Sequence, residues 1–231
     1  ANFAIVFFKA EGEYFMWAQA DDIRSGNFVD VCLKLLEKET KCICCAPPNC
    51  FDYQADNTEK YISFELKGTL CERLTAFWKQ PFKSHGIFDG IVRREAIKEY
   101  FDTYKGFPTC LASDWHLIQF LLTRGEFHRV SNALLVLGSD GVSMQNGFIK
   151  RRRGKLIQFV VPFYEISKRS FLLMLRSNEM SLRQKCSVAA SIVSFNVRFG
   201  VERLGVVRTV RYLYLDFYHH VLPVVLRRDK P

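Results

Sequence analysis

Long uncharged apolar runs are missing from this sequence. Its longest stretch without Lys, Arg, Asp or Glu is Cys186–Val197, which has 12 residues, and a similar stretch, Phe217–Leu226, has 10. A helix needs about 20 mostly apolar residues to cross the hydrocarbon core of a bilayer. We therefore expect no membrane-spanning helix, and we expect the apolar helices either to lie on a membrane surface or to pack on a globular domain.

Leader and targeting features are missing as well. The sequence has no initiator Met, no signal peptide and no transit segment rich in Arg and Ser. It opens at Ala1 directly in a helical pattern, and it contains no internal repeat. We therefore expect a fragment whose true N-terminus lies further upstream.

Paired metal-binding cysteine motifs are missing although the chain has eight cysteines. The densest group, CICCAPPNC at 42–50, has no second C-x-x-C motif and no His nearby, so its spacing does not favour zinc. Most of the cysteines lie inside apolar runs, where a free thiol behaves as a small hydrophobe. This usage indicates a reducing, cytoplasmic compartment.

Charge is present in excess but is unevenly distributed. Residues 147–231 carry 17 Lys/Arg and 5 Asp/Glu, a net charge of +12, whereas residues 1–146 carry 16 and 19, a net charge of −3. The two parts therefore differ in kind. We interpret 1–146 as an α/β domain and 147–231 as a basic amphipathic helical region, which begins near the KRRR run at 150–153.

Apolar periodicity predicts alternating helices and strands along the first part. The expected helices are 2–10, 28–36, 70–78, 96–101 and 111–125, the last with Ser113 as N-cap and Gly125 as C-cap; the expected strands are 14–18, 42–46, 86–94, 126–130 and 133–138; the polar residues 52–60 read as a loop. Three further helices are expected near 156–176, 181–199 and 204–226.

The stretch GEYFMWAQADD at 12–22 has the strongest functional pattern. Tyr14–Ala18 is an apolar, aromatic run that is typical of a central strand covered on both faces. Asp21 and Asp22 follow it, and adjacent carboxylates at the end of a buried strand repel each other unless a cation or a ligand's hydroxyls relieve them. Ligands bind at such strand ends in open α/β sheets. The alternative is that both aspartates cap the next helix.

Four segments, in order, resemble the second half of a family 2 glycosyltransferase with the GT-A fold. They are GEYFMWAQADD, the helix SGNFVDVCLKLLE, the strand and turn HGIFDGIVRRE, and ASDWHLIQFLLTRGEFHRV, which resembles a helix starting with the catalytic base and the strand after it. The resemblance covers about residues 1–145. It implies a partial GT-A, Rossmann-like mixed sheet with flanking helices, followed here by the C-terminal helical region.

This resemblance assigns roles to the acidic residues. Asp22 corresponds to the ligand of a divalent metal, Mg²⁺ or Mn²⁺, and Asp21 to a helper on the nucleotide ribose or the metal. Asp114 corresponds to the general base of an inverting transfer, in the first turn of a helix, where the helix dipole favours the ionised carboxylate. The alternatives are a helix cap for the two adjacent aspartates and an ordinary N-terminal helix charge for Asp114.

The acceptor side is less defined. Asp89 either touches the acceptor or is a strand-edge residue, and Trp115 either lines a sugar-binding wall or belongs to the core. The histidines at 85, 116 and 128 are isolated and are expected to be structural.

Three features depart from the family pattern. The first strand and its P-x-Y-N turn, which hold the nucleoside base, are absent from the sequence. Gln19 stands where many members have a further acidic residue, and Ser113 stands where a Glu often precedes the base. No Q-x-x-R-W motif follows, which argues against a processive synthase.

The resemblance therefore predicts a metal-dependent glycosyltransferase that uses a nucleotide-sugar donor and a saccharide or lipid-linked acceptor in cell-surface polysaccharide biosynthesis. It would act in the cytoplasm or peripherally on the inner face of the membrane. The alternatives are a non-catalytic relative and a binding module that acts through the basic C-terminal helices. Such a module would favour an anionic membrane over nucleic acid, because no nucleic-acid-binding motif is present.

Overall fold

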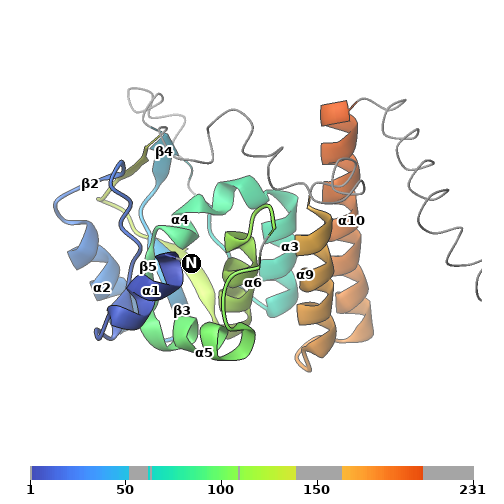
Figure 1. Ribbon diagram of the computed structural model, residues 1–231, viewed down its shortest axis with the longest axis horizontal. Helices are drawn as coiled ribbons and strands as arrows, with labels where there is room; N and C mark the ends of the chain where they lie inside the picture. Colours follow the sequence, from blue (N-terminus) through green and yellow to red (C-terminus); the bar gives the residue numbers. More distant parts are fainter. Residues whose placement is uncertain (1, 52–61, 63, 109, 139–162, 205–231) are drawn as a thin grey trace, which may run out of the picture.

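The computed structural model describes residues 2–51, 62, 64–108, 110–138 and 163–204. This part of the chain is a mixed α/β structure in which two small sheets are flanked by helices (Figure 1). The α/β class expected from the sequence is thereby confirmed. The expected loop at 52–60 and the expected helix near 204–226 lie outside the described residues, apart from Leu204 itself.

The larger sheet has the strand order β1-β5-β3-β6. Its strands are β1 (Tyr14–Phe15), β5 (Ile91–Arg93), β3 (Cys42–Ala46) and β6 (Glu126–Arg129). Strand β3 is buried along its whole length, and it pairs antiparallel with β5 and parallel with β6. The apolar, cysteine-rich run at 42–46 therefore forms the centre of this sheet.

The smaller sheet has the order β2-β7-β4 and joins segments far apart in sequence. Strand β7 (Leu135–Leu137) pairs antiparallel with β2 (Ile23–Arg24) and parallel with β4 (Asn49–Phe51). This sheet brings the chain after Asp22 beside the chain that leads to Gly138.

Helices cover both faces of the sheets. Their bounds are α1 (Asn2–Lys9), α2 (Phe28–Lys38), α3 (Leu70–Lys79), α4 (His85–Phe88), α5 (Arg94–Tyr104), α6 (Asp114–Arg124), α9 (Tyr164–Arg176) and α10 (Leu182–Leu204), with a 3₁₀ turn, η3 (Pro81–Ser84). Cys45 of β3 packs in the apolar cluster that contains α2, whereas Cys44 packs in the larger cluster that contains α3 to α6. The central strand is thus buried on both sides.

The C-terminal helices share the main core. Figure 1 shows α9 and α10 side by side, next to α3 and α6. Phe163, before α9, stacks on Trp115 of α6 with the ring centroids 4.8 Å apart, and Phe195 of α10 lies 5.5 Å from Trp78 of α3. The apolar faces of α9 and α10 therefore pack against the α/β part. No helix in the described ranges has both the length and the apolar character that a bilayer crossing requires.

The prediction of a central strand at Tyr14–Ala18 was wrong. Only Tyr14 and Phe15 form a strand, and β1 is the edge strand of its sheet within the described residues. Trp17 is buried because its indole stacks on Phe88, with the ring centroids 4.6 Å apart and the planes 2° apart. The burial of this run thus comes from aromatic packing against helices, which the apolar pattern alone does not distinguish from a central strand.

The prediction of one strand across 86–94 was also wrong. His85–Phe88 forms the short helix α4, and the strand β5 begins only at Ile91. Between them Gly90 lies so close to β3 that a Cβ there would be 2.6 Å from the carbonyl oxygen of Cys45. Only glycine fits at position 90, because any side chain would collide with β3. Asp89, the residue before it, lies between the end of α4 and the start of β5.

The other expected helices and strands of the first part are present. Ser113 occupies the N-cap position of α6, but its side chain makes no capping hydrogen bond. Gly125 occupies the C-cap position with a φ of 177°, and a Cβ there would lie 2.6 Å from the carbonyl oxygen of Lys41. Any residue could adopt this extended backbone conformation, so the conformation does not require glycine. The close contact with Lys41 does, because it leaves no room for a side chain.

Candidate functional site

The loop after Trp17 is held by Arg24. Its guanidinium Nη2 donates hydrogen bonds to the carbonyl oxygen of Trp17, at 3.1 Å, and to Oδ2 of Asp22, at 3.2 Å. The guanidinium carbon also lies 5.6 Å from the ring centroid of Phe28. Arg24 therefore ties the end of the aromatic run to the acidic pair and to helix α2.

Asp22 is directed inward. Its side chain is only 3% exposed, and its Oδ1 accepts a hydrogen bond of 3.2 Å from the backbone N–H of Gly138. Burial raises the pKa of Asp22, while the Gly138 N–H and the Arg24 charge oppose that rise and the Asp21 charge adds to it. The carboxylate is thus a partly compensated negative charge at the point where β2 and the end of β7 meet.

Asp89 is the most perturbed carboxyl group of the site. It is 3% exposed, and its Oδ1 accepts a hydrogen bond of 2.8 Å from Nε2 of Gln19. Burial raises the pKa of Asp89 to about 7; the Gln19 bond and Arg24 oppose the rise, and the charges of Asp22 and Asp114 add to it. Asp22 and Asp114 are far from Asp89 in the sequence, yet the charge of each raises its pKa. The three carboxyl groups therefore interact electrostatically.

Asp114 and Trp115 occupy the start of α6 and differ in burial. Asp114 is half-buried and is the acidic residue of the first helical turn. Trp115 is 3% exposed, stacks on Phe163 and contacts Phe82 edge-on at a centroid distance of 5.3 Å. Trp115 is therefore a buried core residue, and we do not include it in the proposed acceptor site.

Asp21 lies beside Gly138 at the same place. It is exposed, and a Cβ on Gly138 would come within 2.5 Å of its Cβ, Cγ and Oδ2 atoms. Each oxygen of Asp22 accepts one hydrogen bond, so each retains a lone pair. Two neighbouring carboxylates fit a Mg²⁺ or Mn²⁺ ion that takes its other ligands from phosphate and water oxygens. In the described ranges no group of three or more His, Cys, Asp or Glu side chains forms a complete set of metal ligands.

Sequence reasoning did not predict the roles of three residues that organise this site, although it had noted Gln19 as a departure from the family pattern. Arg24 and Gly138 hold Asp22, and Gln19 holds Asp89. An arginine two residues after an acidic pair favours a local ion pair, so the contact between Arg24 and Asp22 could have been predicted from the sequence. The hydrogen bonds of Gly138 and Gln19 span 116 and 70 residues, respectively, and no local pattern predicts them.

The histidines with described side chains are structural, as expected. The Nδ1 atom of His116 lies 3.0 Å from the hydroxyl oxygen of Tyr100, and burial lowers the pKa of His116 to about 4, helped by the Arg169 charge. The Nε2 atom of His128 lies 2.8 Å from Oε2 of Glu126.

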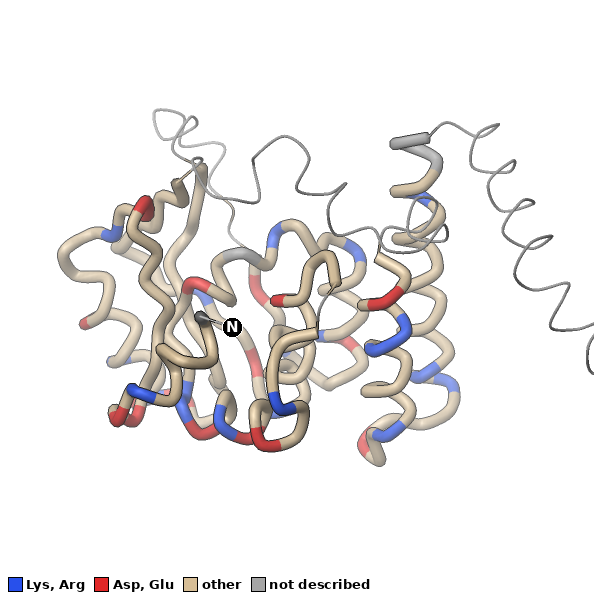
Figure 2. Tube along the Cα trace, viewed as in Figure 1, with Lys and Arg blue, Asp and Glu red and all other residues tan. Residues whose placement is uncertain are grey.

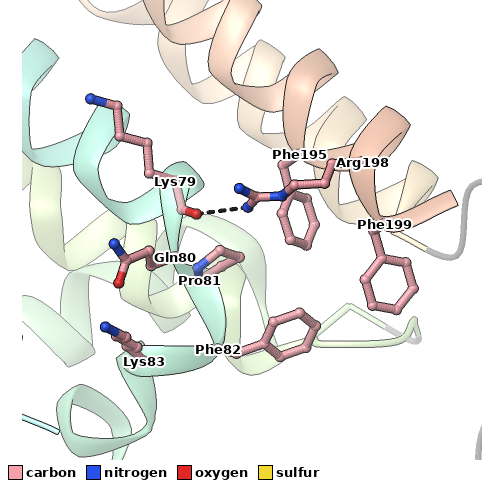
Figure 3. A pocket seen from close by; sticks show the side chains of 8 residues that line it. All are labelled: Lys79, Gln80, Pro81, Phe82, Lys83, Phe195, Arg198 and Phe199. Atoms are coloured by element: carbon pink, nitrogen blue, oxygen red, sulfur yellow. Dashed lines mark hydrogen bonds between the residues drawn. The ribbon is translucent and has the colours of Figure 1, made fainter. Parts of the chain in front are cut away.

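A pocket of about 410 Å³ lies between the C-terminal end of α3, the turn η3 and helix α10 (Figure 3). It is lined by Lys79, Gln80, Pro81, Phe82, Lys83, Phe195, Arg198 and Phe199. Phe82 links it to Trp115, the residue after Asp114.

Comparison of the chain with protein-family models, with curated protein sequences and with solved structures gave no match.

Proposed function

We propose that this chain is the acceptor-side part of a metal-dependent, inverting glycosyltransferase that uses a nucleotide-sugar donor. One observation carries the proposal: Asp22, Asp89 and Asp114 come from three distant segments, and the buried Asp89 experiences the charges of both of the others. The arrangement of β1, β5 and β3 around an antiparallel middle strand is consistent with the partial GT-A sheet that the sequence resembles.

Asp22 and Asp21 are the residues that would hold a divalent metal. When bound, the metal supplies positive charge that stabilises the diphosphate leaving group. The Gly138 N–H and the Arg24 guanidinium fix the orientation of the Asp22 carboxylate. This support matters because a metal-binding carboxylate has to be positioned before the substrate arrives.

Asp114 is the proposed general base. In a single displacement an acceptor hydroxyl oxygen forms a bond to the anomeric carbon of the donor, the bond from that carbon to the phosphate oxygen breaks, and Asp114 takes the hydroxyl proton. The electron pair leaves with the diphosphate. Position at the first turn of α6 favours the ionised form of Asp114 that this role needs.

Asp89 is proposed to contact the acceptor or to modify the electrostatic potential around the base, Asp114. A carboxyl group with a pKa near 7 is either a hydrogen-bond donor or an acceptor close to neutral pH. It thereby suits recognition of a sugar hydroxyl, which can pair with either form.

Calorimetry with UDP and GDP in the presence of Mn²⁺, on the full-length enzyme that includes the nucleoside-binding strand, tests the proposal. Asp22→Asn is expected to weaken nucleotide binding by about tenfold or more, because a charged metal ligand is lost. Asp114→Asn is expected to leave nucleotide affinity nearly unchanged, since a base acts on the acceptor, while it abolishes most sugar transfer. Equal loss of nucleotide affinity in both variants of the full-length enzyme would contradict the separate roles of Asp22 and Asp114.

A second candidate function is attachment to an anionic membrane through α9 and α10. An exposed stripe on α10 carries Leu182, Val193 and Val197, which are 78%, 54% and 58% exposed. Figure 2 shows Lys and Arg at several positions along both helices. Such a surface fits a bilayer interface, where apolar side chains insert and cationic side chains reach anionic headgroups.

A further inference from the structure

We propose that the pocket between α3, η3 and α10 binds an amphiphilic anion, a phosphate ester carried on an apolar chain. Its binding does not depend on glycosyl transfer, and it involves none of the acidic residues of the site described above. The pocket combines an aromatic wall with a basic rim.

The aromatic wall consists of three phenylalanine rings. Phe82 and Phe199 lie 5.8 Å apart, Phe82 and Phe195 lie 5.9 Å apart, and the rings are tilted relative to one another. Phe82 is 47% exposed although it belongs to this packed group. Figure 3 shows Phe195 and Phe199 on α10 and the ring of Phe82 extending toward them from η3. Such a surface favours an alkyl or isoprenoid chain, which would remove the exposed ring area from water.

The basic rim is contributed by both sides. Arg198 of α10 donates a hydrogen bond of 2.9 Å to the carbonyl oxygen of Lys79, which joins the end of α3 to α10 across the pocket. Lys79 and Lys83 are exposed, and within the described residues no hydrogen bond or ion pair engages the Nζ atom of either one. Figure 3 shows their amino groups beyond Gln80, on the side away from the three rings, so each flexible four-carbon side chain has to turn toward the pocket to reach a bound anion.

This combination selects one ligand chemistry. Two flexible ammonium groups and a guanidinium attract a compact anion such as phosphate. The volume of about 410 Å³ leaves room for several carbons of a chain beside the rings. A purely inorganic anion would leave the aromatic wall uncovered, and a neutral chain would leave the lysines without a counter-charge.

The pocket lies beside the start of α6, the helix that begins with Asp114. Phe82 contacts Trp115, and Trp115 follows Asp114 in α6. If the proposed transfer holds, the pocket would receive the lipid phosphate of the acceptor while the sugar lies at Asp114. This extension rests on the proposed function, whereas the binding site itself does not.

Calorimetry with octyl phosphate, kept below its micelle-forming concentration, tests the proposal on the full chain. Lys79→Gln/Lys83→Gln is expected to weaken binding about tenfold, and Phe82→Ser to weaken it about fivefold. Lys9→Gln/Lys38→Gln, which also removes two exposed lysines from the last turns of helices, and Phe8→Ser, which removes an exposed phenylalanine from α1, should each change binding less than twofold.

Comparison ligands measure the separate contributions of the phosphate and of the apolar chain. They also distinguish a membrane lipid from a soluble ester as the source of the phosphate. Inorganic phosphate and 1-octanol should each bind at least tenfold more weakly than octyl phosphate. Vesicles of phosphatidylcholine with phosphatidic acid form the lipid arm: loss of vesicle binding in the Lys79→Gln/Lys83→Gln variant assigns the phosphate to a lipid, and unchanged vesicle binding assigns it to a soluble ester. Equal binding of octyl phosphate by the pocket and control variants, or equal binding of octanol, would overturn the proposal. None of these measurements includes a nucleotide or a metal, so failure of the proposed transfer leaves them unaffected.

Discussion

Gln19 and Asp89 are 70 residues apart in sequence and are joined by a 2.8 Å hydrogen bond from Nε2 of Gln19 to Oδ1 of Asp89. The bond explains why an amide occupies position 19, where the family resemblance leads one to expect an acidic residue. A second carboxylate there would face the buried carboxyl group of Asp89, and the two negative charges would repel each other. The amide instead supplies a donor that stabilises the ionised form of Asp89.

Replacement of Asp89 by Asn should alter how stability depends on pH. Because the folded-state pKa is about 7 and the unfolded value is near 4, the native state holds a proton that the unfolded state has lost between these values. Stability of the unmodified chain should therefore fall as pH rises from about 4 to 7, by about 4 kcal/mol at most, and then level off. The Asn variant, which does not titrate, should lack this decline.

Urea denaturation of both proteins at pH 5, 6, 7 and 8 measures the effect. Only the difference between the two proteins is informative, because other groups titrate in both. A difference that stays constant with pH would show that Asp89 is ionised throughout.

Gln19→Glu should destabilise the fold above pH 7 by about 2 kcal/mol and much less at pH 5, where the two carboxyl groups can share a proton. Gln80→Glu introduces the same change at an exposed position and serves as the control. Thermal melting of the three proteins at pH 5 and pH 8 provides the comparison. Similar melting shifts for both variants at pH 8 would argue against close contact at position 19.

Gly138→Ala should impair the acidic pair with little effect on the rest of the fold. The added Cβ would lie 2.5 Å from atoms of the Asp21 side chain, so this side chain has to move. If Asp21 and Asp22 hold a metal, the Mn²⁺–UDP affinity of the full-length enzyme should fall by about tenfold, since misplaced ligands typically cost that much. Gly26→Ala is the matched control, because no atom lies within 4 Å of the Cβ that it would add. Unchanged affinity in Gly138→Ala would remove Asp21 from the proposed site.

Trp115 should behave as a core residue. Trp115→Ala removes a buried indole that stacks on Phe163 and should cost about 3–5 kcal/mol of unfolding free energy. Trp115→Phe should cost less and should leave the affinity for acceptor unchanged. A large rise in acceptor KM for Trp115→Phe at unchanged stability would instead support the sugar-binding wall. Denaturation and steady-state kinetics on the same preparations separate the two.

Membrane attachment is best tested by substitution. Deletion of 147–231 would remove Phe163, Val188 and Phe195 from the core and would expose apolar surface on α3 and α6. Arg176→Gln/Arg183→Gln changes two exposed basic residues instead. At about 1 kcal/mol per basic residue near an anionic surface, the partition coefficient should fall roughly tenfold or more.

Co-sedimentation with vesicles of phosphatidylserine and phosphatidylcholine measures this partition. Binding should weaken as salt is added, because the attraction is screened, and Lys9→Gln/Lys38→Gln should bind like the unmodified chain. Equal binding to neutral vesicles, or no binding to either kind, would reject electrostatic attachment.

The sequence alone determined most of the local structure. The helices at 28–38, 70–79, 94–104 and 114–124 follow from apolar residues that recur at helical spacing, and the strand at 42–46 follows from a short run of buried residues between polar ones. These patterns are local because a helix or strand buries one stripe or face of its own residues. The difference in net charge between residues 1–146 and 147–231 also follows from the sequence alone.

Tertiary structure decided the rest. The run after Tyr14 is buried by the stacked ring of Phe88, and the run from His85 to Phe88 is helical because its apolar residues meet the core in that form. The pKa of Asp89 is set by burial, by Gln19 and by charges on two other segments. Hydrophobic pattern is a property of neighbouring residues, whereas burial, hydrogen bonding and electrostatic potential depend on which distant segments the fold brings together.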